Sequence, residues 1–249
     1  MRLDLNKHEY ESYICELLGV YAEIKHMLKH INKYAKKQYK PMSVAQTGCK
    51  GYMQNCPYGK VLIVSPWNYP FLLTITPLVD AISAGNTVVI KPSAYSENTS
   101  KVISKIISET FEEKYVACVL GGRKENAELF DKKFDFIFFT GSSSVGKEVA
   151  IKCASRCIPT LLELGGKSPC IVDKTADIKD AAKRIVFGKF VNAGQTCVAP
   201  DYVLCDKSIK DKLIECLISE IRAQYGEETL KNADYGKIIN KKNFDRVVG

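Results

Sequence analysis

The sequence predicts an α/β fold whose mostly parallel sheet is covered by helices on both faces. Short apolar runs alternate along the chain with segments of roughly 10–15 residues whose apolar positions recur at helical spacing, the pattern of strand–helix–strand units. The chain has 249 residues, of which 46% are hydrophobic and 26% are charged. This composition supplies a large core and excludes a disordered chain.

The expected elements follow from the spacing of the apolar residues. Between residues 9 and 37 these positions recur every three or four residues, which predicts a long amphipathic helix. Further helices are expected over residues 71–83, 98–111, 178–191 and 208–225, with another beginning near Ser144. Strands are expected over residues 61–64, 87–90, 115–120, 134–139, 160–164 and 169–172. Residues 40–57, which are polar and contain glycine, are expected to form a connection.

The composition also bears on where the protein works. No apolar run reaches the roughly 18 residues that a membrane-spanning helix requires, because Pro77, Asp80 and Gly85 interrupt the richest stretch. The N-terminus lacks the apolar stretch of a signal peptide. Ten cysteines without an export signal are expected to be reduced thiols, since the cytosol disfavours disulfides. We therefore expect a cytoplasmic protein.

The net charge of +8 is concentrated in one segment. Between Ile24 and Val79 the chain has eight lysines and neither an arginine nor an acidic residue. This pattern favours a solvated basic face of a helix, with an anionic membrane surface as the next candidate partner. Nucleic-acid binding is not expected, because lysines greatly outnumber arginines and no helix-turn-helix or RNP motif follows.

The histidines exclude several kinds of catalytic site. All three, His8, His26 and His30, lie within the first 30 residues, so a Ser-His-Asp or Cys-His site in the body of the chain would have to borrow one of them. No C-x2-C pair is present either, so we expect no metal site. A nucleophilic cysteine would therefore use a carboxylate, water or a cofactor-linked group as its proton acceptor.

Two segments at expected strand ends are candidates for binding a nucleotide. Residues 136–146 read F-I-F-F-T-G-S-S-S-V-G, a strand followed by a glycine- and serine-rich turn that opens a helix. The N–H groups at such a helix start suit a phosphate, although the G-x-G-x-x-G spacing is absent and a serine helix cap is the alternative. Lys91 ends a buried strand, where its ammonium could bind ribose hydroxyls or could simply precede a turn.

Three further residues are candidates for catalysis. Asn68 lies in S-P-W-N-Y-P, where its amide could stabilise an oxyanion, unless this segment is only a rigid aromatic turn. Glu163 lies in an apolar stretch, where burial would raise its pKa and suit a general base, unless it is exposed at an edge. Cys197 follows a Gly-Gln-Thr turn, where nearby N–H groups would favour the thiolate, unless it is a packing residue like the other cysteines.

Together, five motifs in this order resemble the aldehyde dehydrogenase superfamily. They are W-N-Y-P from Trp67, K-P-S from Lys91, G-S-S-S-V-G from Gly141, E-L-G-G-K from Glu163 and G-Q-T-C from Gly194. The flanking sequences N-Y-P-F-L-L-T-I-T-P, K-S-P-C and C-V-A-P-D-Y are similar to those of the class 3 branch, whose members oxidise fatty and aromatic aldehydes. The resemblance covers nearly the whole chain, from about Asp4 onward.

The resemblance implies a three-layer, doubly wound, mostly parallel sheet of the Rossmann-like, NAD(P)-binding type over residues 1–163, including an N-terminal helix. Residues 164–249 would form the first part of an α/β catalytic domain. By the same resemblance Cys197 is the nucleophile, Asn68 and the Cys197 N–H hold the oxyanion, and Glu163 activates water. Lys91 would meet the ribose of NAD or NADP, and a six-residue turn would meet the pyrophosphate. The turn consists of Gly141, Ser142, Ser143, Ser144, Val145 and Gly146.

Two departures from the family pattern have consequences. Class 3 relatives usually have a glutamate after K-P-S, where this chain has Ala94; without that carboxylate a 2′-phosphate meets no like charge, so NADP should be accepted at least as readily as NAD. The chain ends at Gly249, about half the family's length, without the C-terminal segment by which some members attach to membranes, so membrane association is not expected. At full length we expect a homodimeric aldehyde dehydrogenase; the alternative is an inactive fragment that binds nucleotide or a partner.

Overall fold

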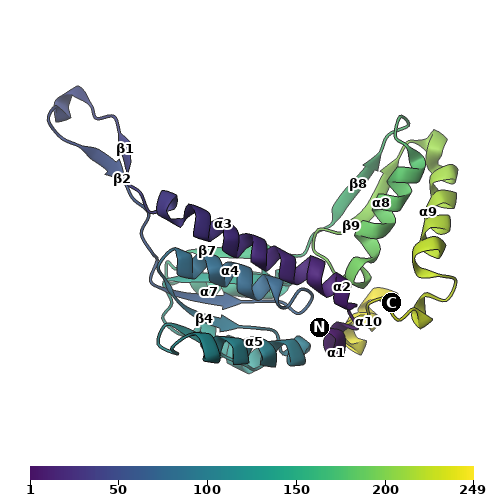
Figure 1. The fold of residues 1–249 in the computed structure, drawn as a ribbon, viewed down its shortest axis with the longest axis horizontal. Coiled ribbons are helices and arrows are strands. Elements are labelled where there is room, and N and C mark those ends of the chain that lie inside the picture. Colours follow the sequence, from purple (N-terminus) through teal and green to yellow (C-terminus); the bar gives the residue numbers. More distant parts are fainter.

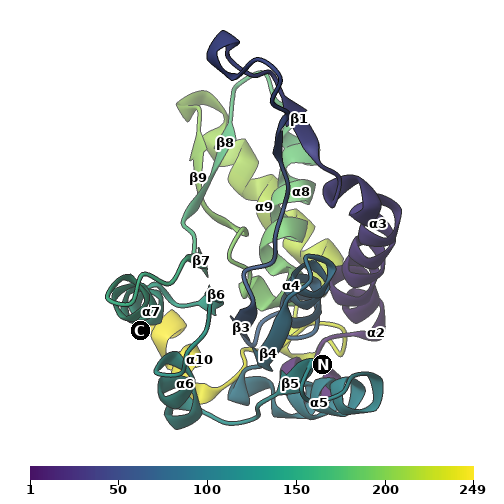
Figure 2. The same ribbon diagram turned by 90° about the vertical axis from the view of Figure 1, so that its left-hand side faces the viewer.

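The protein is built around a five-stranded parallel sheet (Figures 1 and 2). The structure, a computed structural model, describes all residues from 1 to 249. The strands are β3 (Lys60–Val64), β4 (Thr87–Lys91), β5 (Val116–Cys118), β6 (Phe136–Gly141) and β7 (Thr160–Leu164). They lie in the order β5-β4-β3-β6-β7. The chain therefore starts at the central strand β3, winds outward to β5 and then continues on the other side, which is a doubly wound topology.

Helices cover both faces of this sheet and complete three layers. α4 (Leu72–Ser83) and α5 (Glu97–Thr110) pack on one face, and α6 (Arg123–Phe130) and α7 (Ser143–Ala154) pack on the other. Alternate residues of β3 point to the two cores: Val61 and Ile63 lie in the first, Leu62 and Val64 in the second. A strand buried on both faces needs an uninterrupted apolar run, which is the pattern that predicted it. The predicted fold class is confirmed.

The N-terminal region is a nearly continuous helix that lies along α4 (Figure 1). After α1 (Arg2–Leu5), it consists of α2 (Glu9–Ser12), a π-helical turn (Tyr13–Leu17) and α3 (Leu18–Tyr34). Val20 of α3 packs into the core beneath α4 and α5. The amphipathic helix predicted over residues 9–37 is therefore present, with a π-helical turn near its start.

A hairpin follows, where the sequence suggested only a connection. β1 (Gln38–Lys40) pairs antiparallel with β2 (Gly51–Met53), and the two strands project from the body of the molecule (Figure 1). Tyr39 and Tyr52 face each other across the pair, with ring centroids 6.1 Å apart. Strands of three residues are too short to show a readable alternation, so the prediction for residues 40–57 missed them. The eight lysines of the basic segment are exposed along α3, this hairpin and its flanks.

The last third of the chain forms a smaller α/β unit. β8 (Ser168–Val172) and β9 (Pro200–Cys205) make a separate parallel two-stranded sheet. It packs against α8 (Ile178–Phe190) and α9 (Lys210–Tyr225) around a core of Val172, Ala182 and Leu213, and α10 (Lys241–Val248) follows. The change from the first sheet to the second falls between β7 and β8. The division into domains at residues 163 and 164 stays a prediction.

Short 3₁₀ turns link these elements at Val44–Gln46, Ala94–Ser96, Lys207–Ile209 and Thr229–Lys231, and a tight turn with left-handed residues links them at Val191–Gly194. Besides the hairpin, α1, α6, β9 and α10 were not predicted from the sequence. None of the helices combines the length and the hydrophobicity that crossing a membrane requires.

Candidate active site

The loop after β3 carries Asn68 to the segment that precedes Cys197. Nδ2 of Asn68 donates to the main-chain oxygen of Gln195 at 2.8 Å, and the Tyr69 hydroxyl shares a hydrogen bond of 2.6 Å with Oγ1 of Thr196. Gln195 and Thr196 are the two residues before Cys197. The structure therefore brings Asn68 and the Cys197 turn together, although 127 positions separate the bonded residues in the sequence.

The turn that carries Cys197 has an unusual backbone. Its first three residues are left-handed: Asn192 (φ 54°), Ala193 (φ 52°) and Gly194 (φ 76°). This conformation costs about 1–2 kcal/mol for each non-glycine residue, so other contacts must hold it. Nδ2 of Asn192 donates to the oxygen of Asn68 at 2.7 Å, and Oε1 of Gln195 accepts from the N–H of Ile239 at 2.9 Å. The turn so held leaves Cys197 exposed.

The segment after Glu163 lies against the same turn. A Cβ atom added at Gly166 would lie 2.5 Å from the main-chain oxygen of Cys197, which is too close for any side chain. Glu163 is three residues earlier, in the edge strand β7, and its side chain is exposed. The burial considered for Glu163 is therefore absent, and the exposed edge position is the alternative that the structure supports.

Lys91 ends β4 with its side chain almost fully buried. The residue is 2% exposed, and its Nζ donates to the main-chain oxygens of Pro92 at 3.2 Å and Gly121 at 2.5 Å. Burial lowers the pKa of Lys91, because an ammonium ion loses water there, while the carboxylate of Glu125 opposes this shift. Two of its three N–H groups are used, which leaves one donor for a further partner.

The turn after β6 caps a helix and stays open to solvent. Oγ of Ser142 accepts from the N–H of Val145 at 3.5 Å and lies 3.1 Å from Oγ of Ser144, so the predicted serine cap is present. A cap satisfies only part of the first turn, and the remaining N–H groups at the start of α7 can receive a phosphate. Gly146 packs closely against Leu164: a Cβ at Gly146 would lie 2.6 Å from the end of the Leu164 side chain, which would have to move.

Several of these residues lie beyond the carboxyl ends of the parallel strands. β3 and β6 are paired neighbours at the centre of the doubly wound sheet, and the chain leaves them toward opposite edges, to β4 and to β7. Ligands of such folds bind at this point, beyond the carboxyl ends of the strands. The Asn68 loop follows β3, and the serine cap follows β6. The free donors at the start of α7 suit phosphate oxygens, and the spare N–H of Lys91 suits a hydroxyl acceptor.

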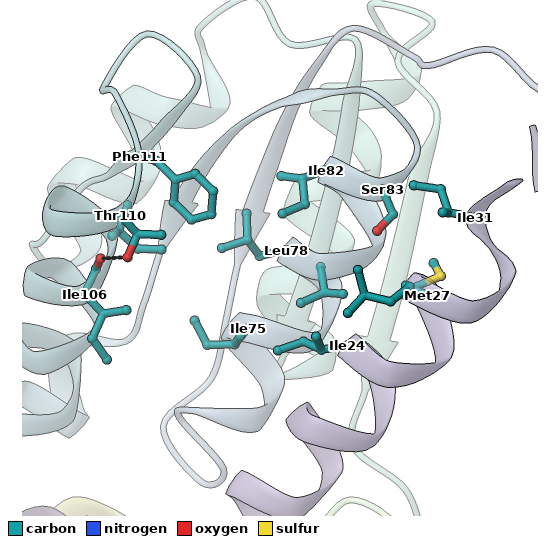
Figure 3. Close-up of a pocket in the computed structure, with 13 residues that line it drawn as sticks. Ile24, Met27, Ile31, Ile75, Leu78, Ile82, Ser83, Ile106, Thr110 and Phe111 are labelled. Atoms are coloured by element: carbon teal, nitrogen blue, oxygen red, sulfur yellow. Dashed lines mark hydrogen bonds between the residues drawn. The ribbon is translucent and has the colours of Figure 1, made fainter.

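The rest of the molecule contains no metal-binding group of side chains but does contain an apolar groove. No group of three or more His, Cys, Asp or Glu side chains is arranged to hold a metal ion. An apolar groove of about 340 Å³ lies between α3, α4 and α5 (Figure 3), and none of its lining residues belongs to the Asn68 loop or the Cys197 turn.

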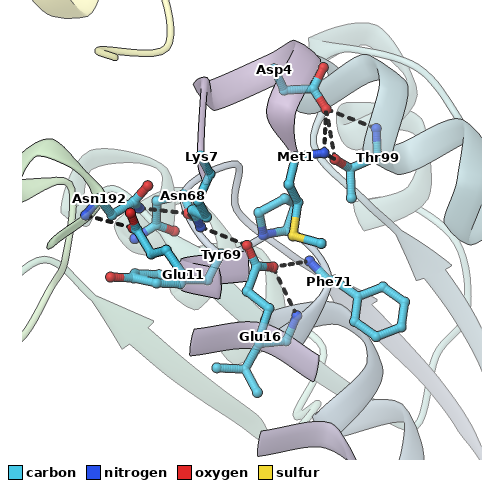
Figure 4. A network of polar contacts seen from close by, with 12 residues as sticks. Met1, Asp4, Lys7, Glu11, Glu16, Asn68, Tyr69, Phe71, Thr99 and Asn192 are labelled. Atoms are coloured by element: carbon cyan, nitrogen blue, oxygen red, sulfur yellow. Dashed lines mark hydrogen bonds and ion pairs between the residues drawn. The ribbon is translucent and has the colours of Figure 1, made fainter. Parts of the chain in front are cut away.

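Four residues that contact the site were not predicted from the sequence. Lys7, Glu11, Glu16 and Asn192 form hydrogen bonds with the Asn68 loop or with each other around it (Figure 4). A signal was present for Glu16: it lies four residues before Val20, on the apolar stripe of the predicted helix, where a charge needs a partner. The other three are separated from their partners by too many residues for a sequence pattern to reveal the contact.

A doubly wound parallel sheet with a serine-capped helix and a buried lysine at its carboxyl edge defines a nucleotide-binding α/β protein. The exposed cysteine in a turn bonded to an asparagine amide adds the features of a nucleophilic site. The chain belongs to the aldehyde dehydrogenase family, whose model matches residues 3–249.

The relatives include class 3 aldehyde dehydrogenases. The chain is 44% identical over 248 residues to a dimeric NADP-preferring aldehyde dehydrogenase of Canis lupus familiaris, covering 99% of this chain and 54% of the relative. It is 41% identical over 245 residues to aldehyde dehydrogenase family 3 member A2 of Pongo abelii, covering 98% of this chain and 50% of that relative. The predicted resemblance is confirmed. The chain spans about half the length of the curated relatives that it matches.

Solved structures agree with this assignment. The substrate-bound state of Staphylococcus aureus AldH superposes with a TM-score of 0.95 at 44% identity, covering 99% of this chain and 54% of that chain. An aldehyde dehydrogenase of Mycobacterium tuberculosis complexed with NAD+ superposes with a TM-score of 0.87 at 26% identity, covering 97% of this chain and 50% of that chain.

Proposed function

We propose that this chain is the cofactor-binding and nucleophile-bearing part of an enzyme that oxidises an aliphatic or aromatic aldehyde to a carboxylic acid with NAD or NADP. The observation that carries the proposal is the hydrogen bond of 2.8 Å from the Asn68 amide to Gln195, two residues before Cys197. It joins a candidate oxyanion donor to the turn that carries a candidate nucleophile, in a chain of the aldehyde dehydrogenase family.

In this scheme the Cys197 thiolate attacks the aldehyde carbon and forms a thiohemiacetal. Nδ2 of Asn68 has two N–H groups, of which one binds Gln195, so the second is free to hold the oxyanion together with the Cys197 N–H. NAD or NADP, when bound, accepts the hydride that leaves this carbon. Glu163 then takes a proton from the water that hydrolyses the resulting thioester, and its exposed position allows water to reach it.

For the cofactor, we infer that Lys91 holds the ribose and that residues 141–146, at the end of β6 and the start of α7, hold the pyrophosphate. A relative is named NADP-preferring, and a structural neighbour is complexed with NAD+. Ala94 is exposed at the start of the turn after Lys91 and carries no charge to repel a 2′-phosphate. We therefore expect kcat/KM with NADP to equal or exceed that with NAD; a strong preference for NAD would count against this role of Ala94.

The test of the reaction uses the purified 249-residue chain with benzaldehyde or a medium-chain aldehyde and either cofactor. Reduced cofactor should form, and Cys197→Ala should abolish it. Cys49→Ala, which removes an exposed thiol of the projecting hairpin, is the matched control and should leave the rate unchanged. Asn68→Ala should lower kcat by about 100-fold or more, the usual effect of losing an oxyanion donor.

A second candidate function follows from the chain's length relative to its relatives. Since the chain spans about half of them, it could bind nucleotide without completing the reaction. Binding of NAD(P) measured by calorimetry, with no turnover of any aldehyde, would favour this function.

Because one relative is named dimeric, we also propose a homodimer, which sedimentation at several concentrations would detect.

A further inference from the structure

A buried ion pair lies directly beneath the Asn68 loop (Figure 4). Nζ of Lys7 and Oε1 of Glu16 are 2.6 Å apart, and both side chains are 0% exposed. The ammonium also lies 4.3 Å from the centre of the Tyr69 ring. Burying two charges costs desolvation energy that their attraction recovers only in part, and a well-packed apolar pair often stabilises a protein as much. Stability alone therefore does not account for this pair.

Both partners contact the main chain of the Asn68 loop. Lys7 Nζ donates to the oxygen of Asn68 at 3.1 Å, at the start of the loop. The second oxygen of Glu16 accepts from the N–H groups of Phe71 and Leu72, at 2.8 and 3.3 Å. These N–H groups begin α4, which has no capping side chain of its own, so the carboxylate also favours the helix dipole. The pair therefore fixes both ends of the segment from residue 68 to residue 72.

The same loop is bonded to the turn that carries Cys197. Nδ2 of Asn192 donates to the Asn68 oxygen that Lys7 also contacts, at 2.7 Å. The main-chain N–H of Asn192 donates to Oε1 of Glu11 at 2.8 Å. A single carbonyl oxygen thus receives one donor from the N-terminal ion pair and one from the left-handed turn. A displacement of the Lys7–Glu16 pair would therefore move both the Asn68 loop and the turn that carries Cys197.

We propose that Lys7 and Glu16 are positioning residues: they hold the Asn68 loop so that its amide and the Cys197 thiol keep their relative placement. The benefit to catalysis rests on the proposed function, because a misplacement of about 1 Å at a reacting centre can cost about 100-fold in rate. The placement itself can be measured through the reactivity of the thiol, without any turnover.

The test variant is Lys7→Met combined with Glu16→Gln in the full chain. It leaves no unpaired buried charge, and the glutamine oxygen can still accept from the start of α4. The matched control is Lys101→Met combined with Glu97→Gln, an ion pair of the same types and the same 2.6 Å separation on the surface of α5. Thermal unfolding shows whether each variant is folded. Should the first variant not fold, Lys7→Arg, which keeps the charge but not the shape of the ammonium, replaces it.

The first measurement is the rate of alkylation of Cys197 by iodoacetamide, followed by mass spectrometry of its peptide, with exposed Cys49 in the same sample as internal standard. We expect the rate at Cys197 to change about threefold or more in the test variant, and in Asn68→Ala, while Cys49 and the surface control stay unchanged. Wild-type reactivity of Cys197 in a folded test variant, or in Asn68→Ala, would overturn the proposal.

The second measurement is a double-mutant cycle on kcat. We expect the test variant to lose about 10-fold in kcat with KM nearly unchanged, and to lose less than twofold when Asn68→Ala is already present, because the pair acts through Asn68. A loss that adds in full to that of Asn68→Ala indicates a merely structural role and would overturn the proposal. If the wild-type chain oxidises no aldehyde, the proposed function fails for this chain, and the alkylation rates still decide the positioning role.

Discussion

Gly166 offers the sharpest test of how the chain after β7 meets the Cys197 turn. A Cβ at this position would lie 2.5 Å from the main-chain oxygen of Cys197. Carbon contacts are favourable at about 3.5–4.0 Å, so Gly166→Ala forces a separation of about 1 Å between the two segments. Because a backbone oxygen cannot rotate away as a side chain can, we expect the variant to lose about 1–3 kcal/mol in the free energy of unfolding, the usual cost of overpacking.

The neighbouring residue supplies the control. A Cβ at Gly165 has no atom within 4 Å, and neither glycine has a left-handed φ, so Gly165→Ala changes the same backbone without a clash. Because alanine restricts the unfolded chain more than glycine does, Gly165→Ala should raise the free energy of unfolding by about 0.4–1 kcal/mol. Urea unfolding followed by the fluorescence of Trp67 measures both variants, and alkylation of Cys197 reports the local displacement. Equal stability and equal alkylation in the two variants would show that the segment from β7 does not press on the Cys197 turn.

Three further substitutions test separate parts of the structure. Asp80 is exposed, but partial desolvation by its neighbours, and then the charge of Glu23, raise the pKa of Asp80 from 3.8 to about 6. The folded protein therefore loses stability progressively as pH rises from about 4 to 6. In urea titrations Asp80→Asn should stabilise the protein by about 1 kcal/mol at pH 7, after allowance for solvent screening, and by nothing below pH ~4. Tyr69→Phe removes the hydrogen bond of 2.6 Å to Thr196 and should cost about 1 kcal/mol in the same titrations. Lys91→Met leaves two carbonyl oxygens without their donor and should weaken NAD(P) binding in calorimetry, whereas unchanged affinity would remove Lys91 from the proposed cofactor site.

The central sheet was predictable because its strands are buried on both faces. Short runs such as V-L-I-V and F-I-F-F contain no polar residue, so they do not show the apolar spacing of an amphipathic helix. Each is followed by a turn and an amphipathic segment. The elements that were missed lack such a local signal. α6 is mostly polar and forms where Glu125 accepts from the N–H of Gly122 at 2.6 Å, and β9 begins with Pro200 and exists only by pairing with β8.

The candidate site was predictable only in part. Asn68, Cys197, Lys91 and the serine-rich turn could be singled out because each follows an expected element, and the family resemblance gave them roles. The exposure of Glu163 was left open because a single charged residue in an apolar strand fits both a buried position and an edge position. Edge position depends on which strands pair, and that information is spread over the whole chain.

The Cys197 turn depends on segments from both ends of the chain, and this explains why its strained backbone can persist. The N–H of Lys237 donates to the oxygen of Leu5 at 2.8 Å, and the oxygen of Lys237 accepts from the side chain of Gln195 at 3.1 Å. Gly236 lies at this junction, where a Cβ would be 3.5 Å from the Leu5 oxygen and 3.6 Å from the main-chain nitrogen of Ala193, both ordinary van der Waals distances. A left-handed turn of this kind is stable only when several contacts over-determine it. Because those contacts come from the first residues, the Asn68 loop and the segment near residue 236, the placement of the thiol follows from completion of the fold rather than from the local sequence around it.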